Sequence, residues 1–95
     1  MTKSNHTELR MKQRGITDRM IQNCIKNGKK EKGNGCVVYL NRFIVVKVSY
    51  DDNIITVQHS KTSQEGIKVY KKRYGVSWSK AIDYYFTVRG CYSVS

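Results

Sequence analysis

Three side chains near the start of the chain are spaced so that they could act together on a phosphodiester. His6, Arg10 and Arg14 lie four residues apart, so a helix here would carry them along one face. An imidazole can move a proton to or from a ribose 2′-hydroxyl, while guanidinium groups hold the phosphate and stabilise its transition-state charge. This chemistry is metal-independent RNA cleavage. The spacing also fits a solvent-facing basic stripe that contacts phosphates without chemistry, because a single histidine does not define an active site.

Two short helices are predicted to carry and follow these residues. The first covers residues 5–14 and ends at Gly15, which readily takes the left-handed conformation of a helix end. The second covers residues 18–27, with Thr17 as its N-cap and an apolar stripe at helical spacing. Neither helix would be stable alone, so we expect both to pack on a sheet. Residues 29–35 are predicted to form a polar loop.

Three strands rich in Val, Ile, Tyr and Thr are predicted next, over residues 36–40, 43–50 and 54–58. With Asp52-Asn53 as a two-residue turn, Tyr50 pairs with Ile55. This register gives an apolar face made of Val46, Val48, Tyr50, Ile55 and Val57. The other face is polar and consists of Lys47, Ser49, Thr56 and Gln58.

Two further helices are predicted in the rest of the chain. Thr62 and Glu65 fit a capping box, Gly75 ends the first of these helices, and Ser77 caps the second. The sequence therefore predicts one α+β domain over residues 1–95. It would have two N-terminal helices, a three-stranded antiparallel sheet and a C-terminal helical hairpin, in the order ααβββαα.

This C-terminal region combines basic and aromatic residues. Residues 71–80 are similar to a helix-turn-helix, although Lys71 stands where a small residue is usual and Ala81 where a branched apolar one is. The alternative is a helical hairpin that covers the sheet. Tyrosines interleave with cations here, which suits stacking on bases, although most of these rings would supply core. The predicted nucleic-acid contacts are Lys12, Lys29, Lys30, Lys71, Lys72, Arg73 and Lys80.

The charge of the chain is strongly positive and unevenly distributed. Lys and Arg number 18 against 7 Asp and Glu, a formal net charge of +11. Residues 1–33 carry nine basic and three acidic side chains, residues 61–95 carry seven and two, and the middle is neutral. Such a charge repels itself in a compact domain and exceeds what solubility needs, so we expect a nucleic-acid partner.

Other function classes find no support in the sequence. The three cysteines, Cys24, Cys36 and Cys91, have no paired spacing, which argues against a disulfide framework and favours a reducing, cytoplasmic compartment. His6 and His59 have no partners at ligand spacing, and no glycine loop follows a strand, so we expect no metal and no cofactor. No apolar run is long enough to cross a membrane.

The basic stripe belongs to a longer pattern that resembles a known group. The sequence His-x3-Arg-Met-x2-Arg-Gly-Ile over residues 6–16, a helix ending at Asn27-Gly28, and the strands around residues 45–48 and 54–57 carry the resemblance. They are similar to a family of small uncharacterised bacterial domains. That family is distantly similar to RelE/ParE-like toxins and to barnase-like ribonuclease toxin domains.

The resemblance covers residues 6–58 and leaves residues 59–95 as a helical extension. It implies a catalytic site lined by His6, Arg10 and Arg14, with Lys47 and Thr56 as its other wall. For this, the first helix must reach the edge of the sheet. Toxins of this group often act beside a neutralising partner, so an acidic protein partner is a further expectation.

We therefore predict a basic protein that binds RNA in preference to DNA and cleaves it as a toxin-like, metal-independent endoribonuclease. One alternative is a non-catalytic nucleic-acid-binding regulator that uses the C-terminal basic helices. Another is an inhibitor protein of a phage or mobile element, which would dock on a nucleic-acid enzyme.

Overall fold

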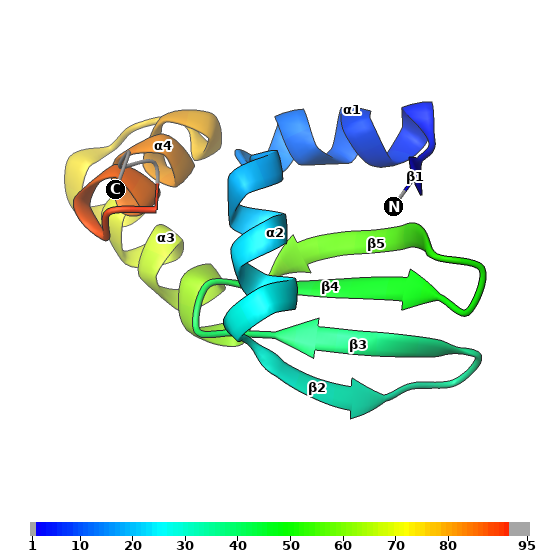
Figure 1. Ribbon diagram of the computed structural model, residues 1–95. Coiled ribbons are helices and arrows are strands. Elements are labelled where there is room, and N and C mark those ends of the chain that lie inside the picture. The colour runs from blue at the N-terminus through cyan, green and yellow to red at the C-terminus, as the bar shows by residue number, and fades with distance from the viewer. Residues whose placement is uncertain (1, 92–95) are drawn as a thin grey trace.

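Within residues 2–91, which the computed structural model describes, the chain forms five strands and four helices (Figure 1). The strands are β1 (Thr2–Lys3), β2 (Lys29–Lys32), β3 (Cys36–Leu40), β4 (Ile44–Ser49) and β5 (Asn53–His59). The helices are α1 (Asn5–Arg14), α2 (Asp18–Asn27), α3 (Lys61–Tyr74) and α4 (Trp78–Val88). None of these helices is long and apolar enough to cross a membrane.

The strands form one mixed sheet in the order β1-β5-β4-β3-β2. Strand β1 runs parallel to β5, and the other neighbours are antiparallel. The structure is thus α+β with four helices, but the predicted three-stranded antiparallel sheet and the order ααβββαα are wrong. Strand β2 escaped prediction because its four residues are all charged and exposed, as suits an edge strand, so no apolar alternation marks it. Strand β1 has only two residues, too few for any pattern.

The register of the β4–β5 hairpin also differs from the prediction. Strand β4 ends at Ser49, and the Asp52 N–H donates to the Ser49 carbonyl, which gives a three-residue loop. Asp52 has a φ of 67°, the left-handed residue that such loops require. Lys47 consequently pairs with Thr56 instead of Gln58.

An irregularity follows next to Lys47, where Val48 pairs with Ile54 and leaves Ile55 as an extra residue. Ile54 is therefore buried, whereas Tyr50 and Ile55, predicted on the apolar face, are 65% and 51% exposed. The rest of the predicted division into two faces is retained, because the register moved by two residues and kept its parity.

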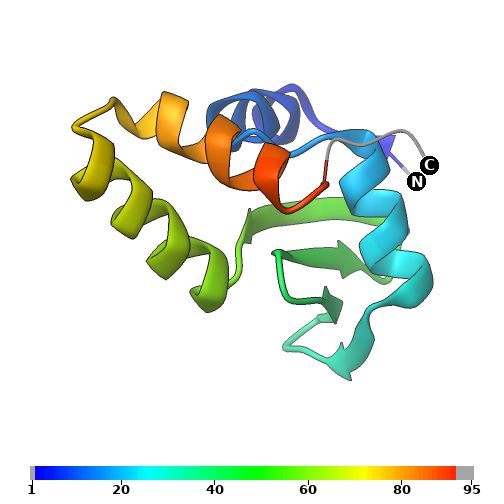
Figure 2. The same ribbon diagram turned by 90° about the vertical axis from the view of Figure 1, so that its left-hand side faces the viewer.

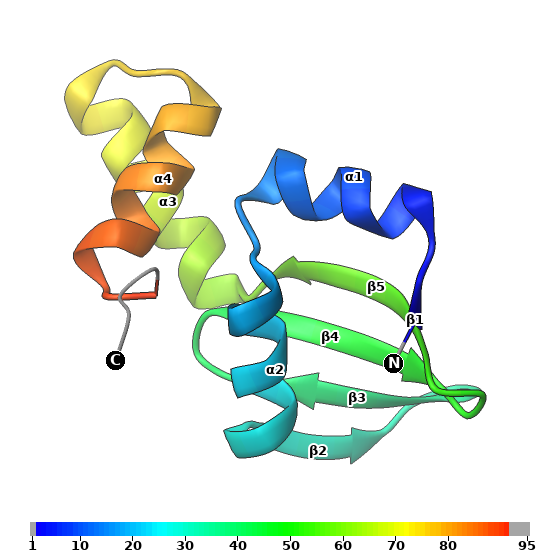
Figure 3. The same ribbon diagram turned by 45° about the horizontal axis from the view of Figure 1, so that its top comes forward.

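The helices take three different positions around the sheet. Helix α2 crosses one face and packs on β4 and β3, whereas α1 runs along the β5 edge (Figures 1 and 3). The α3–α4 hairpin projects beyond the end of β5, and α4 returns to contact α1 (Figure 2). The hairpin therefore extends the fold and does not cover the sheet. The core lies between α2 and the sheet and continues into the α3–α4 hairpin, and its fully buried side chains include Ile21, Cys24, Ile44, Val46, Val57, Ile67 and Phe86.

Local signals set most helix ends as predicted. Gly15 and Gly75 end α1 and α3 in the left-handed conformation, and Thr17 and Ser77 cap α2 and α4. The predicted Thr62 cap is wrong. Ser60 caps α3 instead, because its hydroxyl oxygen accepts the Ser63 N–H at 3.1 Å, and Thr62 lies inside the helix.

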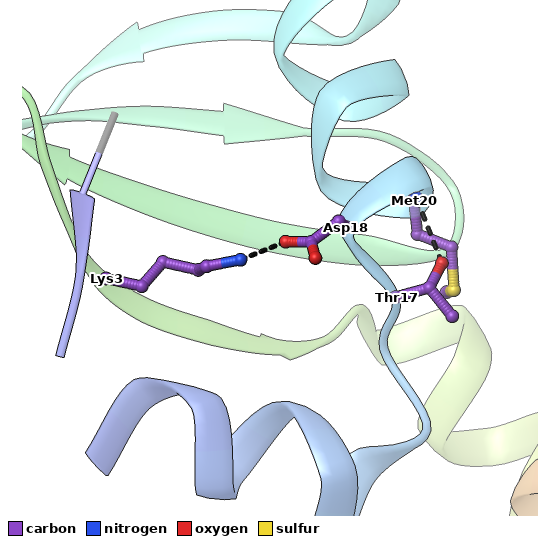
Figure 4. Close-up of polar contacts among 4 residues, drawn as sticks. All are labelled: Lys3, Thr17, Asp18 and Met20. Carbon is purple, nitrogen blue, oxygen red and sulfur yellow. Dashed lines mark hydrogen bonds and ion pairs between the residues drawn. The ribbon is translucent and has the colours of Figure 1, made fainter. Parts of the chain in front are cut away.

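The corner between α1 and α2 is tied to the sheet. Figure 4 shows the Thr17 side chain accepting the Met20 N–H at 3.2 Å, next to an ion pair between Asp18 and Lys3. Lys3 lies in β1, which pairs with β5. The start of α2 and the edge that receives α1 are therefore held together.

Candidate functional site

Helix α1 lies along β5, the strand next to the two-residue edge strand β1, and helps to satisfy the backbone of β5. The Ile54 carbonyl accepts the Thr7 hydroxyl at 3.3 Å, and the Val57 carbonyl accepts Nη1 of Arg14 at 2.7 Å. At the end of α1, Nε2 of His59 lies 2.6 Å from the Arg14 carbonyl, to which it donates. These three contacts fix which face of α1 looks toward β5.

A hollow of about 150 Å³ opens between α1 and β5. Its lining residues are His6, Thr7, Arg10, Arg14, Ile55, Thr56 and Val57. The hollow thus brings together four of the five predicted catalytic residues. The fifth, Lys47, is the cross-strand partner of Thr56 in β4 and lies outside the lining.

The electrostatics of the hollow favour an anion. Burial, and secondly the nearby Arg10 guanidinium, lower the pKa of Arg14. Arg10 and His6 are exposed, and Arg14 and Thr56 are half-buried. None of the lining side chains is acidic. The two guanidinium groups repel each other, and no carboxylate in the hollow offsets this repulsion. A bound phosphate would therefore stabilise both of them.

The size of the hollow indicates what part of a ligand it could take. Pockets that enclose a whole small molecule usually measure about 300–1,000 Å³. At about 150 Å³, this hollow suits a group of about the size of a phosphate, while the rest of a larger ligand would stay outside. In the described part of the chain, no group of three or more His, Cys, Asp or Glu side chains is arranged to hold a metal ion.

The predicted nucleic-acid contacts do not form one surface. Lys12 and Lys80 line a second hollow between α1 and α4. Lys29 and Lys30 lie on β2, at the opposite edge of the sheet from α1, and Lys29 pairs with Glu31 at 3.4 Å. The remaining three, Lys71, Lys72 and Arg73, lie exposed in the last turn of α3.

Two residues that position the site were missed from the sequence. Thr7 is buried, and it lies one residue after His6, outside the four-residue spacing that marks His6, Arg10 and Arg14. His59 is also buried, with its ring 5.5 Å from that of Phe86. Burial is the main cause that lowers the pKa of His59, and the charge of Arg14 lowers it further. The hydrogen bond from His59 to the Arg14 carbonyl acts in the opposite direction and raises the pKa. The alternation of side chains along β5 indicates that His59 is buried, because His59 lies on the same face as Val57, two residues earlier.

Comparison with known proteins adds one finding. A family model described as a domain of unknown function, DUF4258, matches residues 4–59, more than half of the chain. The chain belongs to this family. The predicted membership of a small uncharacterised domain family is therefore confirmed. The DUF4258 match begins before α1 and ends with β5, so it contains every residue of the α1–β5 hollow, and the α3–α4 hairpin follows it. No curated protein and no solved structure matches the chain.

Proposed function

We propose that this DUF4258 protein binds RNA and cleaves it without a metal ion, at the hollow between α1 and β5. One observation carries the proposal. An imidazole and two guanidinium groups surround a space that suits one phosphate, and no acidic side chain lines it. This agrees with the net charge of +11, which favours a polyanion. It also agrees with what the resemblance proposed from the sequence, to RelE/ParE-like and barnase-like toxins, would imply.

In the proposed reaction, His6 accepts the proton of a ribose 2′-hydroxyl. The 2′-oxygen attacks the adjacent phosphorus, the bond from phosphorus to the 5′-oxygen breaks, and the leaving oxygen takes a proton from solvent. The products are a 2′,3′-cyclic phosphate and a 5′-hydroxyl. DNA lacks the attacking hydroxyl, which is why RNA is the favoured substrate.

The cations hold the phosphate while its charge grows. Arg10 is exposed and reaches the non-bridging oxygens from solvent. Arg14 is anchored on Val57, and because a guanidinium has five N–H donors, others remain for the phosphate. Thr56 orients the group, and Lys47 adds positive charge beside it.

The proposal extends to partner and compartment. A neutralising partner would carry acidic side chains, because it must compete with phosphates for the same cations. The three cysteines are unpaired, which favours a reducing compartment such as the cytoplasm.

The test compares purified wild type, His6→Ala and Lys26→Ala on total RNA in excess EDTA. His6 and Lys26 are both exposed helical residues, but Lys26 lies on α2 and does not line the hollow, so it is the matched control. We expect discrete fragments from wild type and Lys26→Ala, and intact RNA with His6→Ala. Intact RNA in all three lanes, or equal cleavage by His6→Ala, would refute the proposal.

A further inference from the structure

Three tyrosines from two helices form a cluster on the α3–α4 hairpin. Tyr70 and Tyr74 lie on α3 and Tyr84 on α4, and we call them the tyrosine patch. The Tyr84 ring meets those of Tyr70 and Tyr74 edge-on, with centroids 5.0 and 5.5 Å apart. Tyr74 is 53% exposed and Tyr84 is 45% exposed, so much of this aromatic surface faces solvent.

The tyrosine patch contacts the buried core, and its own side chains contact one another. Tyr70 is half-buried, and its ring lies 5.8 Å from that of the buried Tyr85. A side-chain hydrogen bond with Tyr74 is the main cause that raises the pKa of Tyr84. The contacts among the rings place them side by side without a ligand, which reduces the entropy lost on binding.

Charge around the tyrosine patch points to an anionic ligand. Arg73 is close enough to Tyr84 to act on its pKa, and Arg73 and Lys71 flank the tyrosine face of α3, whereas Lys72 lies on the opposite face of the helix. Residues 61–95 carry seven basic and two acidic side chains. A second copy of the chain would bring the same positive charge, so self-association through this surface is disfavoured.

We propose that the tyrosine patch stacks on the unpaired bases of single-stranded RNA, while Arg73 and Lys71 contact the phosphates. Exposed aromatic rings beside cations are the elements with which proteins hold single strands, and stacking accepts every base because each has a π-face. The patch lies outside the α1–β5 hollow and on the hairpin that follows the DUF4258 match. Binding at the patch does not depend on cleavage. The further step, that the hairpin selects unpaired RNA for the hollow, rests on the proposed function.

Binding is measured by fluorescence anisotropy with a labelled 2′-O-methyl oligouridine of about 12 nucleotides, within the usual size of single-strand sites. The blocked 2′-oxygen prevents the proposed cleavage. The variants are Tyr74→Ala/Tyr84→Ala, Tyr74→Phe/Tyr84→Phe and Tyr50→Ala. Tyr50 is the matched control, because it is 65% exposed on the loop before β5, far along the chain from the hairpin.

We expect the double alanine variant to bind roughly tenfold or more weakly, the loss expected for one or two base stacks. The double phenylalanine variant keeps the rings and should bind within about twofold of wild type, as should Tyr50→Ala. Equal affinity of wild type and the double alanine variant, or equal affinity of wild type for the strand and for its duplex, would overturn the proposal. So would loss of binding in the phenylalanine variant.

A cleavage assay of wild type on total RNA in excess EDTA, run beside the binding assay, separates this proposal from the proposed cleavage. If the double alanine variant loses affinity while no RNA is cut, the stacking surface stands and the ribonuclease function fails. Capture of an acidic protein in place of RNA, with no oligonucleotide binding, would assign the tyrosine patch to that partner and overturn the inference.

Discussion

Arg10 and Arg14 line the same hollow, yet the structure predicts different consequences for their removal. Arg14 donates to the Val57 carbonyl at 2.7 Å and so joins α1 to the sheet edge. Arg10 is exposed, and no hydrogen bond or ion pair of its side chain is found within residues 2–91. Substituting each with alanine therefore distinguishes an anchoring role from a purely ligand-binding one.

The expected loss of stability follows from these contacts. A hydrogen bond to a charged group contributes about 1.5–3 kcal/mol. In Arg14→Ala, the carbonyl of buried Val57 loses this charged donor, but repulsion between Arg14 and Arg10 disappears, so the net loss should be about 1–2 kcal/mol. For a domain of this size that lowers Tm by roughly 5–15 °C. Arg10→Ala should change stability by about 0.5 kcal/mol or less, because it removes only repulsion.

The assay combines urea unfolding of both variants with cleavage of RNA in EDTA at a temperature where both are folded. Both variants should cut more slowly than wild type, because each removes a phosphate contact. Only Arg14→Ala should unfold at a lower urea concentration than wild type. Equal stability of Arg14→Ala and wild type would refute the anchoring role, and an equal loss in Arg10→Ala would refute the separation of the two roles.

Two further predictions concern the elements that hold the site. Burial lowers the pKa of His59, so the unfolded chain takes up the proton first as the pH falls. The contribution of His59 to stability is therefore present above about pH 6.5 and decreases below it, by at most about 1.4 kcal/mol per pH unit. The difference in unfolding free energy between wild type and His59→Gln should decrease as the pH is lowered from about 7. A difference that does not change with pH would contradict this prediction. Gly66→Ala would place a Cβ against the ring of buried Tyr85, so overpacking of about 1–3 kcal/mol should exceed the gain of about 1 kcal/mol in helix propensity. Its Tm should fall below that of the exposed control Lys68→Ala, and a rise would show that the Tyr85 ring moves freely.

Local signals in the sequence predicted the elements that carry the candidate site. Gly15 and Thr17 delimit α1 and α2 through backbone conformation and capping, which depend on neighbouring residues alone. The four-residue spacing of His6, Arg10 and Arg14 then fixed their common face. Local reasoning failed where pairing with another strand decides the structure, as in the charged strand β2.

Tertiary contacts account for what the sequence did not predict. The β4–β5 connection is a three-residue loop over residues 50–52 instead of the predicted two-residue turn Asp52-Asn53. This difference depends on the left-handed residue Asp52, and it decided the pairing of Lys47. The bond from Arg14 to Val57 joins positions 43 residues apart. The meeting of Tyr74 with Tyr84 likewise depends on how α3 and α4 pack, although both rings lie in segments already marked as basic and aromatic.

The most direct test of the central claim is the chemistry of the RNA ends that wild-type protein produces in excess EDTA. Attack by the 2′-oxygen leaves a 2′,3′-cyclic phosphate on one fragment and a 5′-hydroxyl on the other. Enzymatic end-labelling and mass spectrometry of the fragments identify these groups. We expect both ends, and we expect an oligonucleotide with every 2′-oxygen methylated to stay intact. Fragments with 3′-hydroxyl and 5′-phosphate ends, or no fragments at all, would contradict cleavage at the hollow between α1 and β5.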